Sequence, residues 1–261
     1  AMLAGEGPGG QALDAATRRD ASLSLGEALA QEGEMGKALA IWRDLLSESA
    51  SGDDRVHLQL RMADGLLDSG RLEDAERILN DLVGSSDADV AVQGRLGLGR
   101  LALARGERER ARQAFSEVAR LSTDPAWAVR ALEELASLAE EGADEQAAID
   151  AWRAVVEAAP PGHPAAARAR RATVNRLSAA GRLAEAATAC REAIRAATSP
   201  GERARALLTC AEVDERAGDT AAALSRYEAA SAMAVDGQAE LLLDSTSGLA
   251  RTAQALGRAE L

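Results

Sequence analysis

Residues 25–39 read Leu-Gly-Glu-Ala-Leu-Ala-Gln-Glu-Gly-Glu-Met-Gly-Lys-Ala-Leu, and the spacing of the small residues in this stretch returns along the chain. Gly26 is followed seven positions later by Gly33 and twelve positions later by Ala38. The glycines equivalent to Gly33 recur at intervals of 36 to 39 residues, with Gly142-Ala143 filling one gap; they are Gly33, Gly70, Gly106, Gly181, Gly218 and Gly257. A fixed period of this length indicates an array of repeated structural units.

Other columns of the repeat keep the same register. The alanine that lies five residues after the glycine recurs in all six complete units, as Ala38, Ala75, Ala111, Ala148, Ala186 and Ala223. Four residues after that alanine come large or sulfur-containing residues, namely Trp42, Leu79, Phe115, Trp152, Cys190 and Tyr227. A small residue precedes the glycine by seven positions, with Val174 as the exception. Offsets of three, four and seven place one apolar stripe on a helix, so each unit is predicted to be a helix, a turn at the glycine and a second helix.

Composition supports an all-α fold. The 261 residues include 62 alanines and only five aromatic residues, so strong helix formers are abundant and strand-favouring residues are scarce. The formal net charge of −12 opposes nonspecific binding of nucleic acid, which depends on neutralising phosphates. No apolar run approaches the roughly 18 residues that would cross a bilayer, so we expect no direct membrane insertion in this segment.

The repeat strongly resembles the tetratricopeptide repeat (TPR), both in residues 25–39 and in Ser-Gly-Arg-Leu-Glu-Asp-Ala at 69–75. This resemblance implies a right-handed α-solenoid of about six and a half helix-turn-helix units over residues 19–261. The units are expected near 19–55, 56–91, 92–128, 129–166, 167–203, 204–242 and, in part, 243–261. Residues 1–18 are expected to form a flexible segment that starts with a cloning remnant, and the parent protein is expected to continue after Leu261.

Two features depart from the family pattern. The units are longer than the family's roughly 34 residues, because the links after the second helices carry extra residues. The bulky column near the start of the first helix is also eroded, with Ser22, Gln59, Arg95 and Arg170 in place of large apolar residues. Long links resemble those of bacterial envelope and secretion members of the family, and 29 arginines against one lysine indicate a GC-rich bacterial genome.

Catalytic and cofactor motifs are not evident in the sequence, so we predict a nonenzymatic protein without metal or cofactor. His57 and His163 lie on different repeats, and no nucleophile elbow or phosphate loop is present. Gly-Leu-Gly-Arg-Leu-Ala at 97–102 matches a dinucleotide fingerprint literally, but it lies within a first helix and is better explained by close helix packing. Cys190 and Cys210 occupy core columns, where buried thiols are favoured, with a disulfide or a reactive thiol as alternatives.

In a TPR array the first helices line the concave face, and the resemblance assigns ten residues to a groove there. One half of this groove is predicted to be apolar, with Leu23, Leu60, Leu67, Leu96 and Leu103. The other half is predicted to be polar and basic, with Arg130, Arg168, Arg171, Asn175 and Arg205. The family's carboxylate clamp for a peptide C-terminus is incomplete, because Thr209 and Gly248 stand where asparagine and a basic residue are needed.

These observations lead to two functional hypotheses. The first is a protein-protein interaction scaffold that binds a partner protein or peptide, with an acidic motif, in the concave groove. Its setting would be a bacterial assembly, envelope, secretion, pilus or polarity system, and the unpaired C-terminal helix, expected to fray or to pack on another copy, would allow self-association. The alternative is the regulatory arm of a larger signalling enzyme or transcription regulator. No signal-peptide pattern opens the sequence, but in an excised segment this says little about the parent protein, so localisation stays open between bacterial cytoplasm and periplasm.

Overall fold

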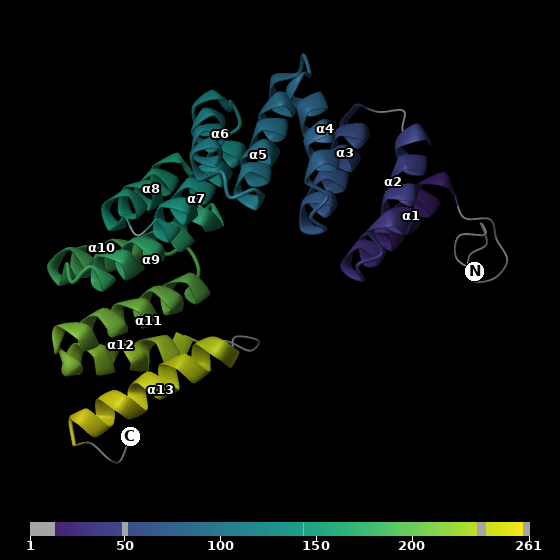
Figure 1. Cartoon of the computed structure of the whole chain (residues 1–261). Helices are drawn as coiled ribbons and strands as arrows, with labels where there is room; N and C mark the ends of the chain where they lie inside the picture. Colours follow the sequence, from purple (N-terminus) through teal and green to yellow (C-terminus); the bar gives the residue numbers. More distant parts are fainter. Residues whose placement is uncertain (1–13, 49–51, 143, 234–238, 258–261) are drawn as a thin grey trace, which may run out of the picture. The chain divides into compact units, whose positions relative to one another are not determined.

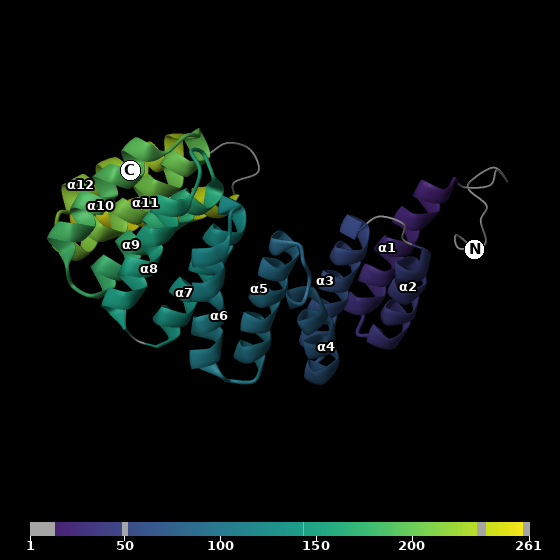
Figure 2. The same ribbon diagram turned by 90° about the horizontal axis from the view of Figure 1, so that it is seen from above.

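The computed structural model describes residues 14–48, 52–142, 144–233 and 239–257, and within these ranges the chain is all-α. Thirteen helices follow one another in the described residues (Figures 1 and 2). They are α1 (Ala15–Gln31), α2 (Met35–Glu48), α3 (Gly52–Asp68), α4 (Leu72–Val83), α5 (Ala88–Ala104), α6 (Arg108–Leu121), α7 (Pro125–Glu141), α8 (Glu145–Ala158), α9 (Pro164–Ala179), α10 (Leu183–Ala196), α11 (Pro200–Ala217), α12 (Thr220–Met233) and α13 (Ala239–Ala255). The predicted all-helical repeat fold is confirmed. Most of the segment predicted to be flexible, residues 1–18, lies outside the described residues, and α1 begins within it at Ala15.

The helices belong to two compact units, Ala1–Trp127 and Ala128–Leu261. In the first unit α3 packs against α5, and in the second α11 packs against both α9 and α13. Even-numbered helices pack beside odd-numbered neighbours, for example α4 against α3 and α5 in the first unit and α10 against α9 and α11 in the second. Odd-numbered helices therefore form one layer of each unit and even-numbered helices form the other.

The glycine column forms the turns between the two helices of a repeat. Gly33, Gly70, Gly106, Gly181, Gly218 and Gly257 all have φ between 66° and 81°. This left-handed backbone conformation costs little for glycine, which lacks the Cβ that crowds the backbone in other residues. The residue that recurs every 36 to 39 positions is thus the one that ends each first helix and reverses the chain.

The alanine column lies where the two helices of a repeat cross. All six alanines are at most 1% exposed, so their methyl groups lie in the interior. The column four residues later supplies the core residues Trp42, Leu79, Phe115, Cys190 and Tyr227, each at most 3% exposed. Trp152 differs from the predicted core position, because its side chain is only half-buried and its Nε1 donates a hydrogen bond to Glu140 Oε1 at 2.9 Å.

Proline and a side-chain cap begin each of the first helices α7, α9 and α11. The Asp124 carboxylate accepts a hydrogen bond from the Ala126 amide at 2.8 Å, and His163 Nδ1 accepts one from the Ala165 amide at 3.2 Å. At α11 the Ser199 hydroxyl accepts from the Glu202 amide at 3.2 Å. These caps satisfy orphan amides at the helix starts, so His163 has a structural role.

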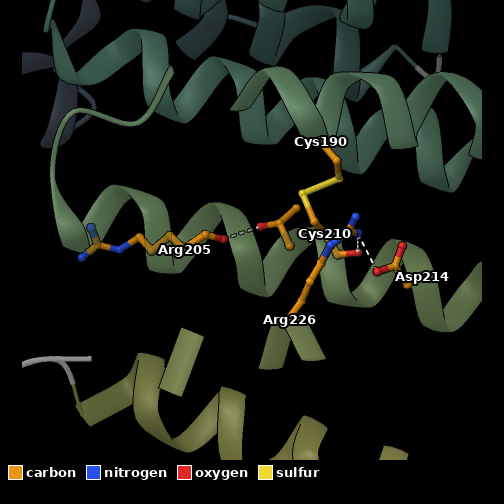
Figure 3. The surroundings of a disulfide bond; sticks show 6 residues. Cys190, Arg205, Cys210, Asp214 and Arg226 are labelled. Carbon is orange, nitrogen blue, oxygen red and sulfur yellow. Dashed lines mark hydrogen bonds and ion pairs between the residues drawn. A yellow bond between two sulfur atoms is a disulfide. The ribbon is translucent and has the colours of Figure 1, made fainter. Parts of the chain in front are cut away.

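A disulfide joins the two cysteines of the second unit. Cys190 on α10 and Cys210 on α11 are fully buried with Cα atoms 5.6 Å apart, and their sulfur atoms are bonded (Figure 3). Burial of both residues is confirmed, but the favoured prediction of two free thiols is wrong. The bond cross-links neighbouring repeats, because α10 and α11 belong to successive units.

Candidate functional site

The five leucine candidates lie on α1, α3 and α5 of the first unit: Leu23, Leu60, Leu67, Leu96 and Leu103. Leu96 is only 4% exposed, so its side chain is part of the interior and is closed to a partner. The other four are half-buried, and Leu23 and Leu67 pack against the core around Trp42. Leu60 packs against the neighbouring core that contains Leu79. Much of the apolar surface of these leucines is therefore used to hold the repeats together.

The five polar candidates lie on odd-numbered helices of the second unit, whose surface we call the odd-helix face. Arg130 is on α7, Arg168, Arg171 and Asn175 are on α9, and Arg205 is on α11. All of them reach solvent, with Arg171 half-buried and the other four exposed. The side chains of Arg130 and Asn175 form no hydrogen bond or ion pair with any residue that the structure describes.

Arg168 is neutralised by the preceding repeat. Its Nη2 donates to Glu133 Oε1 at 2.6 Å, which joins α9 to α7. The carboxylate is 25% exposed and the guanidinium 53% exposed, so this pair is partly desolvated on its acidic side. Exposed pairs of this type contribute about 0–1 kcal/mol to stability, and this pair mainly fixes the direction of Arg168.

The positive charges of Arg171 and Arg205, unlike that of Arg168, are not compensated by a carboxylate. Neither guanidinium forms an ion pair with a described residue. Desolvation lowers the pKa of Arg171, the positive charges of Arg205 and Arg168 lower it further, and Glu202 opposes them. Arg171 therefore lies among like charges with part of its hydration removed, an arrangement that an added anion would stabilise.

Arg205 and the disulfide share one helix. Arg205 precedes Cys210 by five residues on α11, and its side chain extends away from the sulfur atoms (Figure 3). One turn further along, the buried Asp214 forms an ion pair with Arg226 at 2.5 Å, and Arg226 donates to the carbonyl oxygen of Cys210 at 3.1 Å. Desolvation raises the pKa of Asp214 and Arg226 opposes this shift. The disulfide and this ion pair fix α11 to α10 and α12, and so fix the base from which Arg205 projects.

The part of the chain with described coordinates holds no group of side chains suited to a metal ion. Among the same residues, no helix combines the length and apolar character needed to cross a bilayer. The glycine-rich stretch at 97–102 lies inside α5, and a methyl group added to Gly99 would lie 2.4 Å from Phe115 Cε1. Close helix packing, as predicted, accounts for these glycines.

Comparison with known families identifies the repeat. Residues 60–126 and 96–163 match the model of the tetratricopeptide repeat. Residues 60–163 are therefore similar in sequence to tetratricopeptide repeats. No curated protein matches the sequence significantly.

Solved structures of other proteins share the fold. The apo form of RapI has a TM-score of 0.67 at 10% identity, covering 92% of this chain and 72% of that one. The apo quorum sensor NprR from B. thuringiensis has a TM-score of 0.55 at 13% identity, with coverages of 95% and 74%. BtubC from P. vanneervenii has a TM-score of 0.57 at 13% identity, with coverages of 82% and 90%. At such low identities the likeness shows the fold alone.

Thr209 and Gly248, which stand at two positions of the family's carboxylate clamp, both have contacts within the fold. The Thr209 hydroxyl donates to the backbone oxygen of Arg205 at 3.1 Å. Gly248 lies against the ring of Tyr227, and a methyl group added there would lie 2.4 Å from Cε1. A longer side chain at position 248 could not replace glycine without moving that ring.

Sequence reasoning missed a polar network at the other end of the odd-helix face. Glu215 accepts a hydrogen bond from the Tyr227 hydroxyl at 2.7 Å and another from Arg251 Nη2 at 3.0 Å. Desolvation and the Glu215 carboxylate raise the pKa of Tyr227. Arg251 lies 36 residues after Glu215, one repeat period, and this spacing was the available signal. The odd-helix face therefore has an uncompensated arginine end and a compensated acidic end.

Proposed function

We propose that this TPR protein is a nonenzymatic scaffold that binds a segment of a partner protein on the odd-helix face of its second unit. The observation that carries the proposal is the partly desolvated Arg171, which lies beside Arg205 and lacks an ion-pair partner among the described residues. A charged group in this position lowers stability unless something else compensates it. A bound anionic side chain would supply that compensation.

The partner segment is proposed to carry internal acidic side chains. Guanidinium groups bind carboxylates through two parallel hydrogen bonds, which gives direction as well as charge recognition. Because the C-terminal clamp is incomplete, recognition would rest on side-chain carboxylates and not on a chain end. Arg130 and Asn175 are exposed on the same face and are proposed as flanking polar contacts.

The first unit is proposed to add apolar contacts. The exposed parts of Leu23, Leu60, Leu67 and Leu103 are available for this, whereas Leu96 is not. Self-association is a further proposal for α13, which packs against α11 and α12 yet leaves Leu242 45% and Leu243 68% exposed. Large exposed apolar side chains of this kind are common at contact surfaces.

A bacterial assembly, envelope, secretion, pilus or polarity system is the proposed setting, supported by the arginine-rich composition and the long links. The second candidate is a regulatory arm of a signalling enzyme or transcription regulator. Its support is the fold shared with RapI and with NprR, which is a quorum sensor. A catalytic or DNA-binding domain in the full coding sequence would favour this second candidate.

Capture from a bacterial lysate on immobilised protein tests the scaffold proposal. The variant Arg171→Glu/Arg205→Glu is compared with the control Arg120→Glu/Arg195→Glu, which makes the same charge change at exposed positions elsewhere. We expect the partner to be lost with the first variant, to be kept by the control and to be released by added salt. A partner retained by both variants, each with native helicity, would contradict binding on the odd-helix face.

A further inference from the structure

The second unit has a cavity of about 600 Å³ between α8 and α10, away from the odd-helix face. Both helices pack against α9, and side chains from all three helices form the cavity floor. The floor contains Val156, Thr173 and Ala189, and Thr173 is buried with its hydroxyl donating to the Ala169 carbonyl at 2.9 Å. The hydroxyl of Thr173 is therefore not free to donate, and the other two floor side chains are aliphatic. Such a floor suits the apolar part of a bound side chain.

Five charged side chains line the cavity: Arg153, Glu157, Arg170, Glu185 and Glu192. Two of them are already compensated outside the cavity. Arg153 pairs with Asp150 at 3.8 Å, and Glu185 accepts from Arg182 Nε at 2.7 Å. Glu157 on α8 and Glu192 on α10 are exposed and form no ion pair with a described residue. Two uncompensated carboxylates therefore line the cavity from its two wall helices.

Arg170 on α9 also lines the cavity, and it forms no ion pair with a residue that the structure describes. It occupies the eroded bulky column, where the neighbouring repeats carry Leu132 and Leu207, so an apolar filler is missing at this joint. Arg170 also lines two smaller cavities that contain Glu202, and its charge helps to lower the pKa of Glu202 after the hydrogen bonds from Thr198. The positive charge of Arg170 thus also acts on Glu202, which does not line the α8–α10 cavity.

We propose that the α8–α10 cavity is a second interaction site, which takes a basic side chain, arginine or lysine, from a partner protein. The methylene stem of such a side chain would lie on Val156, Thr173 and Ala189, and its cationic head would lie between Glu157 and Glu192. Lysine and arginine combine an apolar stem with a charged end in this way. The inference goes beyond the proposed function, because it concerns a different face and the opposite charge.

The test is a titration of isotopically labelled protein with N-acetyl-arginine amide and N-acetyl-lysine amide, followed by amide NMR. The neutral isostere N-acetyl-citrulline amide and the acidic N-acetyl-glutamate amide serve as control probes. We expect both basic probes to shift the amides of residues that line the cavity, and the other two probes to shift them much less. Equal shifts with citrulline, or stronger binding of the glutamate probe, would overturn the proposal.

Two variants locate the site. Glu157→Gln/Glu192→Gln should weaken the basic probes about fivefold, the effect of two partly exposed ion pairs, while Glu48→Gln/Glu228→Gln should leave binding unchanged. Ala184→Leu, at an exposed position lining the cavity, should block the probes without loss of helicity. Arg171→Glu/Arg205→Glu should still bind them, so this site and the odd-helix face can fail independently. Unchanged binding in both cavity variants would overturn the proposal.

Discussion

Gly26 lies directly beneath Trp42, so close that a methyl group added to Gly26 would lie 2.3 Å from Nε1 of the indole. Gly26 belongs to the first helix of its repeat and Trp42 to the second. The absence of a side chain at one position therefore makes room for the largest side chain at the other. The same relationship holds between Gly99 and Phe115, because a methyl group added to Gly99 would lie 2.4 Å from Cε1 of the phenyl ring. These pairs set how closely the two helices of a repeat approach.

Gly26→Ala should lower the free energy of unfolding by about 1–3 kcal/mol, because overpacking at the indole outweighs the gain of about 1 kcal/mol that alanine normally brings to a helix interior. Urea denaturation measures this. Gly36→Ala is the matched control, since a methyl group there meets nothing within 4 Å, and it should be neutral or stabilising. A Gly26→Ala protein as stable as the wild type would show that the helices do not pack this closely.

Gly218→Ala tests the turn alone, because φ is 78° and no atom lies within 4 Å of an added methyl group. The expected loss is about 1–2 kcal/mol from backbone crowding, and Gly218→Asn should lose less because asparagine tolerates the left-handed region better. Thermal unfolding of the three proteins gives the order. Equal stability of alanine and glycine at this position would contradict the turn geometry.

The disulfide closes a loop with a sequence separation of 20 residues. Removing it in Cys190→Ala/Cys210→Ala should cost about 3 kcal/mol by the loop-entropy estimate. Denaturant unfolding of the oxidised wild type against the double variant measures this loss. Titration of free thiols in unfolded, unreduced protein is the independent check: two reactive thiols in protein purified from an oxidising compartment would contradict the bond.

The Glu215 network predicts a pH effect. Desolvation raises the pKa of this carboxyl, but hydrogen bonds from Arg251 and Tyr227 lower it below the ordinary 4.5 overall. A lowered folded-state pKa gives stability that is present above pH 4.5 and is lost as the pH falls through the folded-state value. The wild type minus Glu215→Gln difference in unfolding free energy should therefore shrink on acidification below that pH. A difference that is constant from pH 7 to pH 3 would exclude this linkage.

The sequence allowed the repeat, its turns and its helix crossings to be predicted, because each depends on one residue type at a fixed spacing. Gly33 and its equivalents were identifiable since a left-handed turn favours glycine, and Ala38 since a close crossing excludes larger side chains. The family's first-helix columns also allowed Arg168, Arg171 and Arg205 to be assigned to first helices. Each of these constraints acts within one repeat and recurs in the others, so a repeated match in the sequence is a reliable signal.

Other features depend on how neighbouring repeats dock, which spacing alone does not determine. Cys190 and Cys210 were both recognised as core residues, but only the crossing of α10 and α11 brings their sulfur atoms together. Leu96 was assigned to an open groove, whereas the packing around α5 buries it. Arg168 forms an ion pair with Glu133, 35 residues earlier in the sequence. This pair compensates the charge of Arg168, whereas Arg171 and Arg205 have no such partner among the described residues.

The central claim is that Arg171 and Arg205 bind acidic side chains of a partner. Fluorescence anisotropy with a labelled peptide that carries internal Glu-Glu pairs and an amidated C-terminus tests it most directly. We predict that Arg171→Glu/Arg205→Glu weakens binding at least about tenfold, that Arg120→Glu/Arg195→Glu changes it less than about twofold, and that salt weakens the wild type. Equal loss in both variants would indicate nonspecific charge attraction, and equal affinity of the wild type and Arg171→Glu/Arg205→Glu would contradict the account.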